Sequence, residues 1–365
     1  MKPAATTSSA WDFLVDRAEL RRRVLRDAEP DGRLLDGDVR IRVDAFALTA
    51  NNLTYAVTGD RFGYWRLFPA DADWGRIPAW GVGTVERSEC PDVGVGERFA
   101  GMVPMSTHFI AHPRVNRDGF TDRATHRADV NPVYNRYVCV TGRADTELER
   151  DAALRPVYLL SFVLARHLRT SDWLGAARLL VTSASSKASL GLAHALSSAD
   201  VSVVGLTSSR HVELVTATGL YDDIVAYDRI ATLPTAPTSA LIDVSGGAAV
   251  RHALRQHLAR RLIDTVHVGQ TDWDQPADEL LGATGGAAPF FAPTAIQQLV
   301  GEWGPAEFAR RLDADLRTFT AHSRRWLDVE YRDGRTAMTG AFDDVADGAV
   351  PPDRFIIVRP TTAHR

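Results

Sequence analysis

Residues 179–196 constrain the fold most strongly, because an apolar strand pattern passes through a turn of small residues directly into a helical pattern. The segment reads Leu-Leu-Val-Thr-Ser-Ala-Ser-Ser-Lys-Ala-Ser-Leu-Gly-Leu-Ala-His-Ala-Leu. In such a βα unit, backbone N–H groups and a helix N-terminus point toward whatever lies above the turn, and this is the usual place of a dinucleotide's pyrophosphate. The segment therefore predicts the first unit of a dinucleotide fold.

The pattern of this segment repeats along the chain. Strand-like and helix-like segments alternate, which is typical of a parallel, doubly wound sheet with right-handed crossovers. The predicted strands are 179–182, 201–206, 224–227, 240–244 and 265–268, and the predicted helices are 189–196, 212–218 and 249–262.

The first part of the chain is β-rich instead. Residues 38–44 alternate apolar and polar side chains, residues 81–86 begin another short strand, and residues 94–101 place a turn before a further one. Many short strands separated by Gly and Pro favour a barrel or rolled sheet. Near the end, residues 293–312 look helical and residues 355–358 give a closing strand.

These patterns divide the chain into four parts. We expect a disordered N-terminus at 1–10, a β-rich domain at 11–150, a nucleotide-binding domain at 151–285 and a return to the first domain at 286–365.

Composition excludes several classes of protein. The chain has 365 residues and a formal net charge of −4, which gives no bias toward nucleic acid or membrane. Its cysteines, Cys90 and Cys139, are too few for a zinc quartet or a disulfide framework. No run approaches the roughly 20 apolar residues of a membrane span. We therefore expect a cytoplasmic protein.

Several motifs occur in a recognisable order. Gly-Asp-Val-Arg-Ile-Arg-Val at 37–43 is followed by Asn51, Asn52, Tyr55 and Gly59. The later motifs are Val-Gly-Glu-Arg-Phe-Ala-Gly at 95–101, Arg-Pro-Val-Tyr-Leu-Leu-Ser-Phe at 155–162, Thr-Gly-Leu-Tyr-Asp-Asp-Ile-Val-Ala-Tyr at 218–227 and Asp-Val-Ser-Gly at 243–246. In this order they resemble the zinc-free, quinone-oxidoreductase-like branch of the medium-chain dehydrogenase/reductase (MDR) superfamily.

Other segments are similar to one uncharacterised subfamily of that superfamily, known only as a domain of unknown function. They are residues 134–135, 183–187, 204–208 and 289–293. The resemblance implies an α/β protein with a GroES-like β-rich domain and a doubly wound parallel Rossmann sheet. It also implies a substrate between the two domains and a homodimer formed through an edge strand near residues 265–271.

The predicted phosphate loop departs from the family's A-x-x-G-x-x-G pattern, because Lys187 and Leu190 replace its glycines. Ser183, Ser185 and Ser186 offer hydroxyl groups at a helix start, and Lys187 adds a cation that could meet phosphate. Two interpretations stay open: an anion site, or a turn whose serines only cap the helix.

The end of the second strand carries hydroxyl residues and an arginine, but no acid. NAD-binding sheets usually place Asp or Glu here, so the pattern favours NADP if a dinucleotide binds. Arg210 could equally be an ordinary surface charge. The residues of this strand end are Thr207, Ser208, Ser209 and Arg210.

The resemblance implies further cofactor contacts at Ser161, Ser245, Gly246, Val268 and Gly269. In the linking helix, Tyr158 and Leu159 replace small residues of the family, and their bulk either narrows the nicotinamide slot or packs in the core.

Tyr55, Asn51 and Asn52 are the candidate catalytic residues, because a phenol and two amides can donate hydrogen bonds to a carbonyl oxygen that gains charge. A hydrogen-bonded turn explains the two asparagines equally well. Nearby aromatic residues could roof an apolar pocket: Phe62, Tyr64, Trp65, Phe68, Trp74 and Trp80.

We expect no metal site. Residues 78–83 lack the zinc ligands of other branches, and His108 and His112 lie too far apart on a strand to share one metal.

The leading functional hypothesis is an NADP(H)-dependent oxidoreductase of quinone or enone reductase type, acting on a small carbonyl compound. One alternative is a dinucleotide-independent lyase, isomerase or tailoring enzyme on the same fold, and another is a ligand-binding protein without enzyme activity.

Overall fold

The computed structural model describes residues 10–28, 34–71, 73–244, 247–268, 290 and 292–361. The chain forms two compact units. Unit 1 comprises Met1–Ala153 and Val329–Arg365, and unit 2 comprises Leu154–Asp328.

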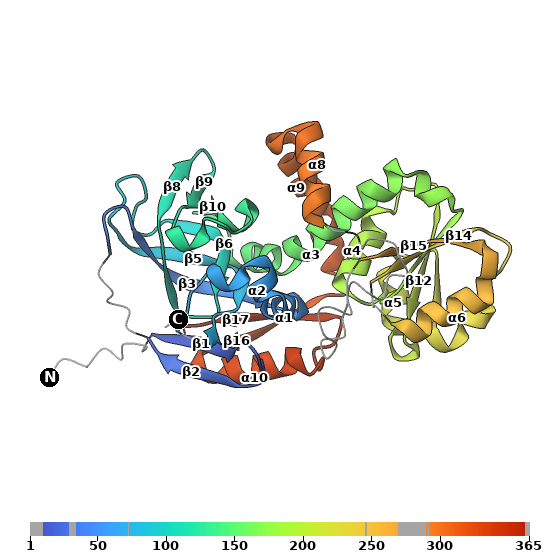
Figure 1. Cartoon of the computed structure of the whole chain (residues 1–365), viewed down its shortest axis with the longest axis horizontal. Helices are drawn as coiled ribbons and strands as arrows, with labels where there is room; N and C mark the ends of the chain where they lie inside the picture. Colours follow the sequence, from blue (N-terminus) through green and yellow to red (C-terminus); the bar gives the residue numbers. More distant parts are fainter. Residues whose placement is uncertain are drawn as a thin grey trace. The chain divides into compact units, whose positions relative to one another are not determined.

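Most of unit 1 is one sheet, in which every strand pair from β17 to β8 is antiparallel (Figure 1). Its strands follow the order β16-β17-β3-β5-β6-β10-β9-β8, and β7 also pairs with β3. The strands are β3 (Val39–Leu48), β5 (Pro78–Ser88), β6 (Arg98–Pro104), β7 (His108–Ala111), β8 (Pro113–Asn116), β9 (Gly119–Asp122), β10 (Arg136–Cys139), β16 (Asp328–Asp333) and β17 (Arg354–Arg359).

A smaller sheet and several short helices complete unit 1. The sheet has the order β2-β1-β4. Its strands are β1 (Trp11–Asp16), β2 (Arg23–Asp27) and β4 (Trp74–Gly75), and the helices are α1 (Ala50–Val57), α2 (Gly59–Phe62), η1 (Tyr64–Arg66), η2 (Thr125–Arg127), η3 (Pro132–Asn135) and α10 (Gly334–Ala346).

The alternating pattern of β3 explains how the large sheet forms its core. Val39, Ile41 and Val43 are buried, whereas Arg40 and Arg42 between them are partly exposed. Gly81 on β5 is required by the close approach of β3, because a Cβ there would lie 2.5 Å from the carbonyl oxygen of Ala45.

Unit 2 contains a five-stranded, fully parallel sheet of order β13-β12-β11-β14-β15. The strands are β11 (Arg178–Val181), β12 (Ser202–Thr207), β13 (Asp223–Ala226), β14 (Ser239–Asp243) and β15 (Leu262–His267). After β13 the chain returns to the other side of β11, so the topological switch point lies between β11 and β14. Ligands of open α/β sheets bind at the carboxyl ends of the strands at this point.

Helices cover both faces of this sheet (Figure 1). On one face, Leu179 and Val181 pack with Leu164 of α3 (Asp145–Thr170) and Leu192 of α4 (Lys187–Ala195). On the other face, Leu180 packs in a cluster with α6 (Ala248–Leu258). α5 (Val212–Thr218) follows β12. The predicted strands and helices of this region therefore occur in the predicted order, but α6 ends at Leu258 and β15 begins at Leu262, within the helix predicted at 249–262.

The chain returns to the first unit later than expected. We predicted the return at 286, but in the structure it occurs at Val329. The intervening helices, α8 (Ala292–Trp303) and α9 (Pro305–Ser323), belong to unit 2. α9 packs against α4, and Phe319 of α9 stacks on Tyr158 of α3 with ring centroids 4.9 Å apart.

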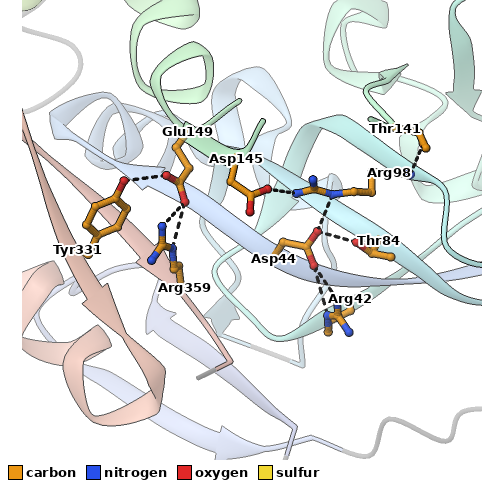
Figure 2. A network of polar contacts seen from close by, with 9 residues as sticks. All are labelled: Arg42, Asp44, Thr84, Arg98, Thr141, Asp145, Glu149, Tyr331 and Arg359. Carbon is orange, nitrogen blue, oxygen red and sulfur yellow. Dashed lines mark hydrogen bonds and ion pairs between the residues drawn. The ribbon is translucent and has the colours of Figure 1, made fainter. Parts of the chain in front are cut away.

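Polar contacts hold the first turns of α3 to the sheet of unit 1 (Figure 2). Asp145 accepts a hydrogen bond from Arg98 of β6 at 2.7 Å. One turn later, Glu149 pairs with Arg359 of β17 at 2.8 Å and accepts a hydrogen bond from the hydroxyl of Tyr331 at 2.9 Å. Among the described helices, none is both long and apolar enough to cross a membrane.

Candidate functional site

Three tyrosines from separate elements of unit 1 meet in one cluster: Tyr55 of α1, Tyr64 of η1 and Tyr134 of η3. The ring centroids of Tyr55 and Tyr64 lie 4.7 Å apart, and the hydroxyl oxygens of Tyr64 and Tyr134 lie 3.1 Å apart. The indole N–H of Trp80 donates a hydrogen bond to the Tyr55 hydroxyl at 3.0 Å. We call these four residues the phenol cluster.

The two predicted asparagines take different roles. The Asn51 side chain is partly exposed and lowers the pKa of the Tyr55 phenol, against the larger effect of burial. Asn52 is buried, accepts a hydrogen bond from the Thr49 backbone N–H at 2.7 Å and donates to the Pro78 carbonyl oxygen at 3.0 Å. The amide of Asn52 therefore caps α1 and ties it to β5, whereas Asn51 and Tyr55 form one polar group.

Tyr134 is the main member of the cluster that sequence reasoning did not assign a role. Its backbone carbonyl accepts a hydrogen bond from the guanidinium of Arg127 at 3.4 Å. That guanidinium is buried and paired with the buried carboxylate of Asp122 at 2.9 Å. The only signal in the sequence was the Tyr134-Asn135 motif, which gave no indication of Tyr64 as its partner.

Burial raises the pKa of the clustered phenols. It raises the pKa of Tyr64 to about 12, and the pKa values of Tyr55 and Tyr134 rise further above the ordinary range for the same reason. An ordinary phenol is already neutral at pH 7, so these shifts act only in the alkaline range.

The turn after β11 in unit 2 carries the predicted serines in a strained backbone. Ser183 has a φ of 48°, in the left-handed region that favours glycine. Its N–H donates to the hydroxyl of Tyr227 at 2.8 Å, and its carbonyl oxygen accepts from the Ser186 N–H at 2.7 Å. The Ser186 hydroxyl then caps α4 by accepting from the Ser189 N–H at 3.2 Å.

A histidine not assigned by sequence links two of the predicted cofactor residues. The Nδ1 atom of His211 lies 3.3 Å from the Ser185 hydroxyl and 3.2 Å from the Ser208 hydroxyl. The neighbouring Ser209 hydroxyl donates to Asp228 at 2.8 Å. These residues bring the ends of β11, β12 and β13 together into one polar edge, which we call the hydroxyl edge.

The other residues predicted near this strand end differ in exposure. Arg210 is exposed beside the hydroxyl edge, whereas Thr207 is buried. Lys187 occupies the first position of α4 and is partly exposed. Leu190, which replaces a family glycine, is 1% exposed in the core, so its side chain does not obstruct the exposed face of the turn.

Ser161 serves helix packing in this structure rather than the predicted cofactor contact. It is 1% exposed and its hydroxyl donates to the Ala188 carbonyl oxygen of α4 at 2.8 Å. The two helices approach so closely because of Gly191, where a Cβ would lie 2.8 Å from the Ser161 Oγ atom. Tyr158 is also buried in this packing, where its ring stacks on Phe319. The side chain of Tyr158 is therefore part of the core.

At the switch point, side chains already bridge β11, β14 and β15. The buried carboxylate of Asp243 accepts from the Thr182 hydroxyl at 3.0 Å and pairs with Arg251 at 2.8 Å. The Nδ1 atom of His267 lies 3.5 Å from the same carboxylate, and burial lowers the pKa of this histidine. The Val268 N–H is taken by the Asp243 carbonyl oxygen at 2.9 Å. Ser245, Gly246 and Gly269 lie outside the described residues.

No group of three or more potential metal ligands occurs within the described ranges. His108 faces Glu86 at 3.0 Å and His112 faces Asp38 at 2.9 Å, so the two histidines have separate carboxylate partners.

Solved structures share this fold at low sequence identity. CurA from Vibrio vulnificus, solved in complex with NADPH, has a TM-score of 0.62 and 12% identity, over 97% of this chain and 100% of that one. CurK enoyl reductase has a TM-score of 0.58 and 14% identity, over 96% and 99%. The quinone oxidoreductase from Coxiella burnetii has a TM-score of 0.55 and 13% identity, over 96% and 99%.

The chain therefore shares the fold of these solved structures, a GroES-like β-rich unit and a doubly wound parallel Rossmann sheet, and the predicted fold class is confirmed. The chain belongs to the family described as "Protein of unknown function (DUF2855)", whose model matches residues 46–351. No curated protein matches the sequence.

Proposed function

We propose that this chain is an NADP(H)-dependent, zinc-free oxidoreductase of quinone or enone reductase type that acts on a small carbonyl compound. The observation that carries the proposal is the Tyr55 phenol, whose oxygen accepts a hydrogen bond from the Trp80 indole N–H at 3.0 Å in the GroES-like unit. NADPH supplies a hydride when it binds. As the hydride adds to the substrate, the carbonyl oxygen gains charge, and the Tyr55 hydroxyl and the Asn51 amide stabilise it by hydrogen bonding.

The hydroxyl edge of unit 2 fits a phosphate-bearing cofactor. Ser185, Ser186 and Lys187 are all partly exposed at the start of α4. Hydroxyl groups, a cation and a helix N-terminus are the donors that phosphate oxygens accept. Ser208 and Arg210 extend these donors to the end of β12, where a 2′-phosphate is distinguished from a ribose hydroxyl.

The carboxylate of Asp228 contacts a predicted cofactor residue at this edge, Ser209. A negative charge there opposes a 2′-phosphate, so Asp228→Asn should shift the NADPH to NADH affinity ratio toward NADPH. Arg210→Ala should shift the same ratio toward NADH. If the two variants shift the affinity ratio in opposite directions, the hydroxyl edge is the part of the site that distinguishes NADPH from NADH.

The test of the proposal is a titration of the full chain with NADPH and NADH, followed by fluorescence or calorimetry. We expect saturable binding with NADPH preferred, and Lys187→Ala should weaken it by about 1.5–3 kcal/mol without changing the melting temperature. Arg260→Ala, at an exposed site on the 3-10 helix after α6, is the matched control. No saturable binding at millimolar cofactor would contradict the proposal.

A dinucleotide-independent lyase or tailoring enzyme is the second candidate, because one observation favours it. The Ser183 N–H lies in the turn where a phosphate oxygen would be bound, but it already donates to Tyr227 at 2.8 Å. Tyr227→Phe releases this N–H and should tighten NADPH binding if the turn holds phosphate. A mass spectrum of the purified protein separates a retained dinucleotide, another ligand and an empty protein.

We also propose a homodimer formed through β15. Among the described strands, β15 ends the parallel sheet, and Ile263 on it is 44% exposed. Light scattering should give twice the 40.0 kDa mass of the chain at tens of micromolar. A monomer at that concentration would contradict the assembly and leave the reductase proposal intact.

A further inference from the structure

A cavity of about 290 Å³ lies in unit 1, lined by residues that the proposed reaction does not use. Its wall comes partly from β3 and β7, where Arg40 and Ile110 are directly paired across the two strands. Apolar groups supply another part of the wall, including Leu67, Phe68 and Phe109. None of its lining residues belongs to the phenol cluster.

The cavity lining carries two arginines and one carboxylate among its described residues, and each arginine has a carboxylate partner. Arg40 and Arg76 are cationic, whereas Asp12 is the only carboxylate among the described lining residues. Arg76 pairs with Asp12 at 2.7 Å through one terminal nitrogen, and Arg40 contacts Glu86 at 3.4 Å. The side chain of Arg40 is 13% exposed and that of Arg76 is 28% exposed, so both cations act where solvent screens them less than at an open surface.

Polar atoms of the lining remain unsatisfied within the described part of the chain. The Nε atom of Arg76 and the Nδ1 atom of His108 are both buried without a hydrogen-bond partner there. Such atoms are rare in native proteins, and because both are buried from solvent they lie beneath the wall of the cavity and do not face into it. A carboxylate accepts hydrogen bonds from a guanidinium with a geometry that matches its fork of donors.

The volume sets the size of the ligand. A water molecule occupies about 30 Å³ in the liquid, so 290 Å³ corresponds to a molecule of about ten non-hydrogen atoms. Phe68 and Phe109 offer aromatic surface to an apolar body. We propose that this cavity is a second binding site, for a small monocarboxylate with an aromatic or aliphatic body, whose carboxylate meets Arg76 and Arg40.

Calorimetry of the full chain with phenylacetate, and with phenylacetamide as its uncharged counterpart, tests the site. We expect saturable binding of the acid, and binding of the amide at least about tenfold weaker, because only the acid gains charge-assisted hydrogen bonds. Equal affinity for both compounds, or no binding of the acid at millimolar concentration, would overturn the proposal.

Substitutions at Ile110 locate the binding. Its side chain is 42% exposed and lies opposite Arg40, so a charge introduced there changes the potential of the cavity with little cost to the fold. Ile110→Glu should weaken phenylacetate binding about tenfold, Ile110→Lys should strengthen it, and Ile110→Gln should change it by less than about threefold. Opposite effects of the two charges cannot come from misfolding.

Val115→Glu is the matched control, because Val115 is 44% exposed and does not line the cavity. It should bind phenylacetate like the unaltered chain. Equal weakening by Val115→Glu and Ile110→Glu would mean that only net charge matters, which also overturns the proposal. NADPH affinity should stay the same in all these variants, so this test and the cofactor test fail independently.

Discussion

Ser183 shows at the scale of one residue how the turn after β11 departs from a glycine-rich loop. Its φ of 48° is the conformation for which glycine is usually selected, yet a serine occupies it. Hydrogen bonds to Tyr227 and Ser186 hold the backbone in this state. The turn therefore holds a left-handed backbone at a serine through its contacts.

Substitution at this position should follow the backbone preference. Ser183→Val should lower the free energy of unfolding by about 1–2 kcal/mol, because a β-branched residue is disfavoured in the left-handed region. Ser183→Gly should leave it nearly unchanged. Ser202→Val, at an exposed position on β12, is the control and should have no destabilising effect. Denaturant unfolding measures all three, and an equal loss at both positions would contradict the role of the φ angle.

The phenol cluster makes the free energy of unfolding depend on pH in the alkaline range. Burial raises the pKa of Tyr64 to about 12 in the folded state, against an unfolded value of about 10. Between these values the unfolded chain loses the proton while the folded chain keeps it. The free energy of unfolding should therefore fall as pH rises through this window, and it should be independent of this group below about pH 9.

Tyr64→Phe removes one such group and should make the decline between about pH 10 and 12 shallower, by up to about 1.4 kcal/mol per pH unit. Urea midpoints measured across this range give the slope. An unaltered slope in the variant would mean that the Tyr64 phenol is not shielded from solvent as described.

At the scale of elements, α3 and α4 are joined by a contact that only glycine permits. A Cβ on Gly191 would lie 2.8 Å from Ser161 Oγ and 3.1 Å from a ring carbon of Tyr158. Gly191 thus gives close helix packing, the role that one glycine of the dinucleotide motif has in related folds. This role could not be read from the sequence because it depends on which helix lies opposite.

Gly191→Ala should therefore cost about 1–3 kcal/mol of stability through overpacking. Gly301→Ala in α8 is the matched control, since nothing lies within 4 Å of its added Cβ, and it should instead stabilise by up to about 1 kcal/mol. Thermal unfolding reports both changes. Ser161→Ala in the Gly191→Ala background should recover part of the loss, and no recovery would contradict this contact.

The anchor of α3 on unit 1 offers a second test at this scale. Glu149 is buried against Arg359 and Tyr331 (Figure 2). Glu149→Gln should lower the free energy of unfolding by about 1–3 kcal/mol, because the Arg359 guanidinium loses its counter-charge. Glu147→Gln, at a site 55% exposed, should change it by less than about 0.5 kcal/mol. Similar effects of the two changes would show that burial does not strengthen the Glu149 pair.

At the scale of the whole molecule, the sequence predicts what depends on local pattern. Alternation along β3 and the βα succession from β11 to β15 are local, and the fold built from them is confirmed. Contacts between distant elements were not predicted. Tyr134 and Tyr64 are in contact although they are 70 residues apart in the sequence, and His211 and Ser185 are in contact although they are 26 residues apart. The return at Val329 was missed because an amphipathic pattern does not identify the surface a helix will cover.

Hydride transfer from the cofactor is the most direct test of the central claim. The full chain is incubated with NADPH deuterated at C4 of the nicotinamide and a panel of small enones, and the products are analysed by mass spectrometry. We expect deuterium bound to carbon in at least one product. Tyr55→Phe should lower kcat/KM by about tenfold or more through loss of a hydrogen-bond donor to the developing oxyanion. NADPH that binds but neither transfers deuterium to any enone nor is oxidised by a quinone would contradict the assignment of this chain as a reductase.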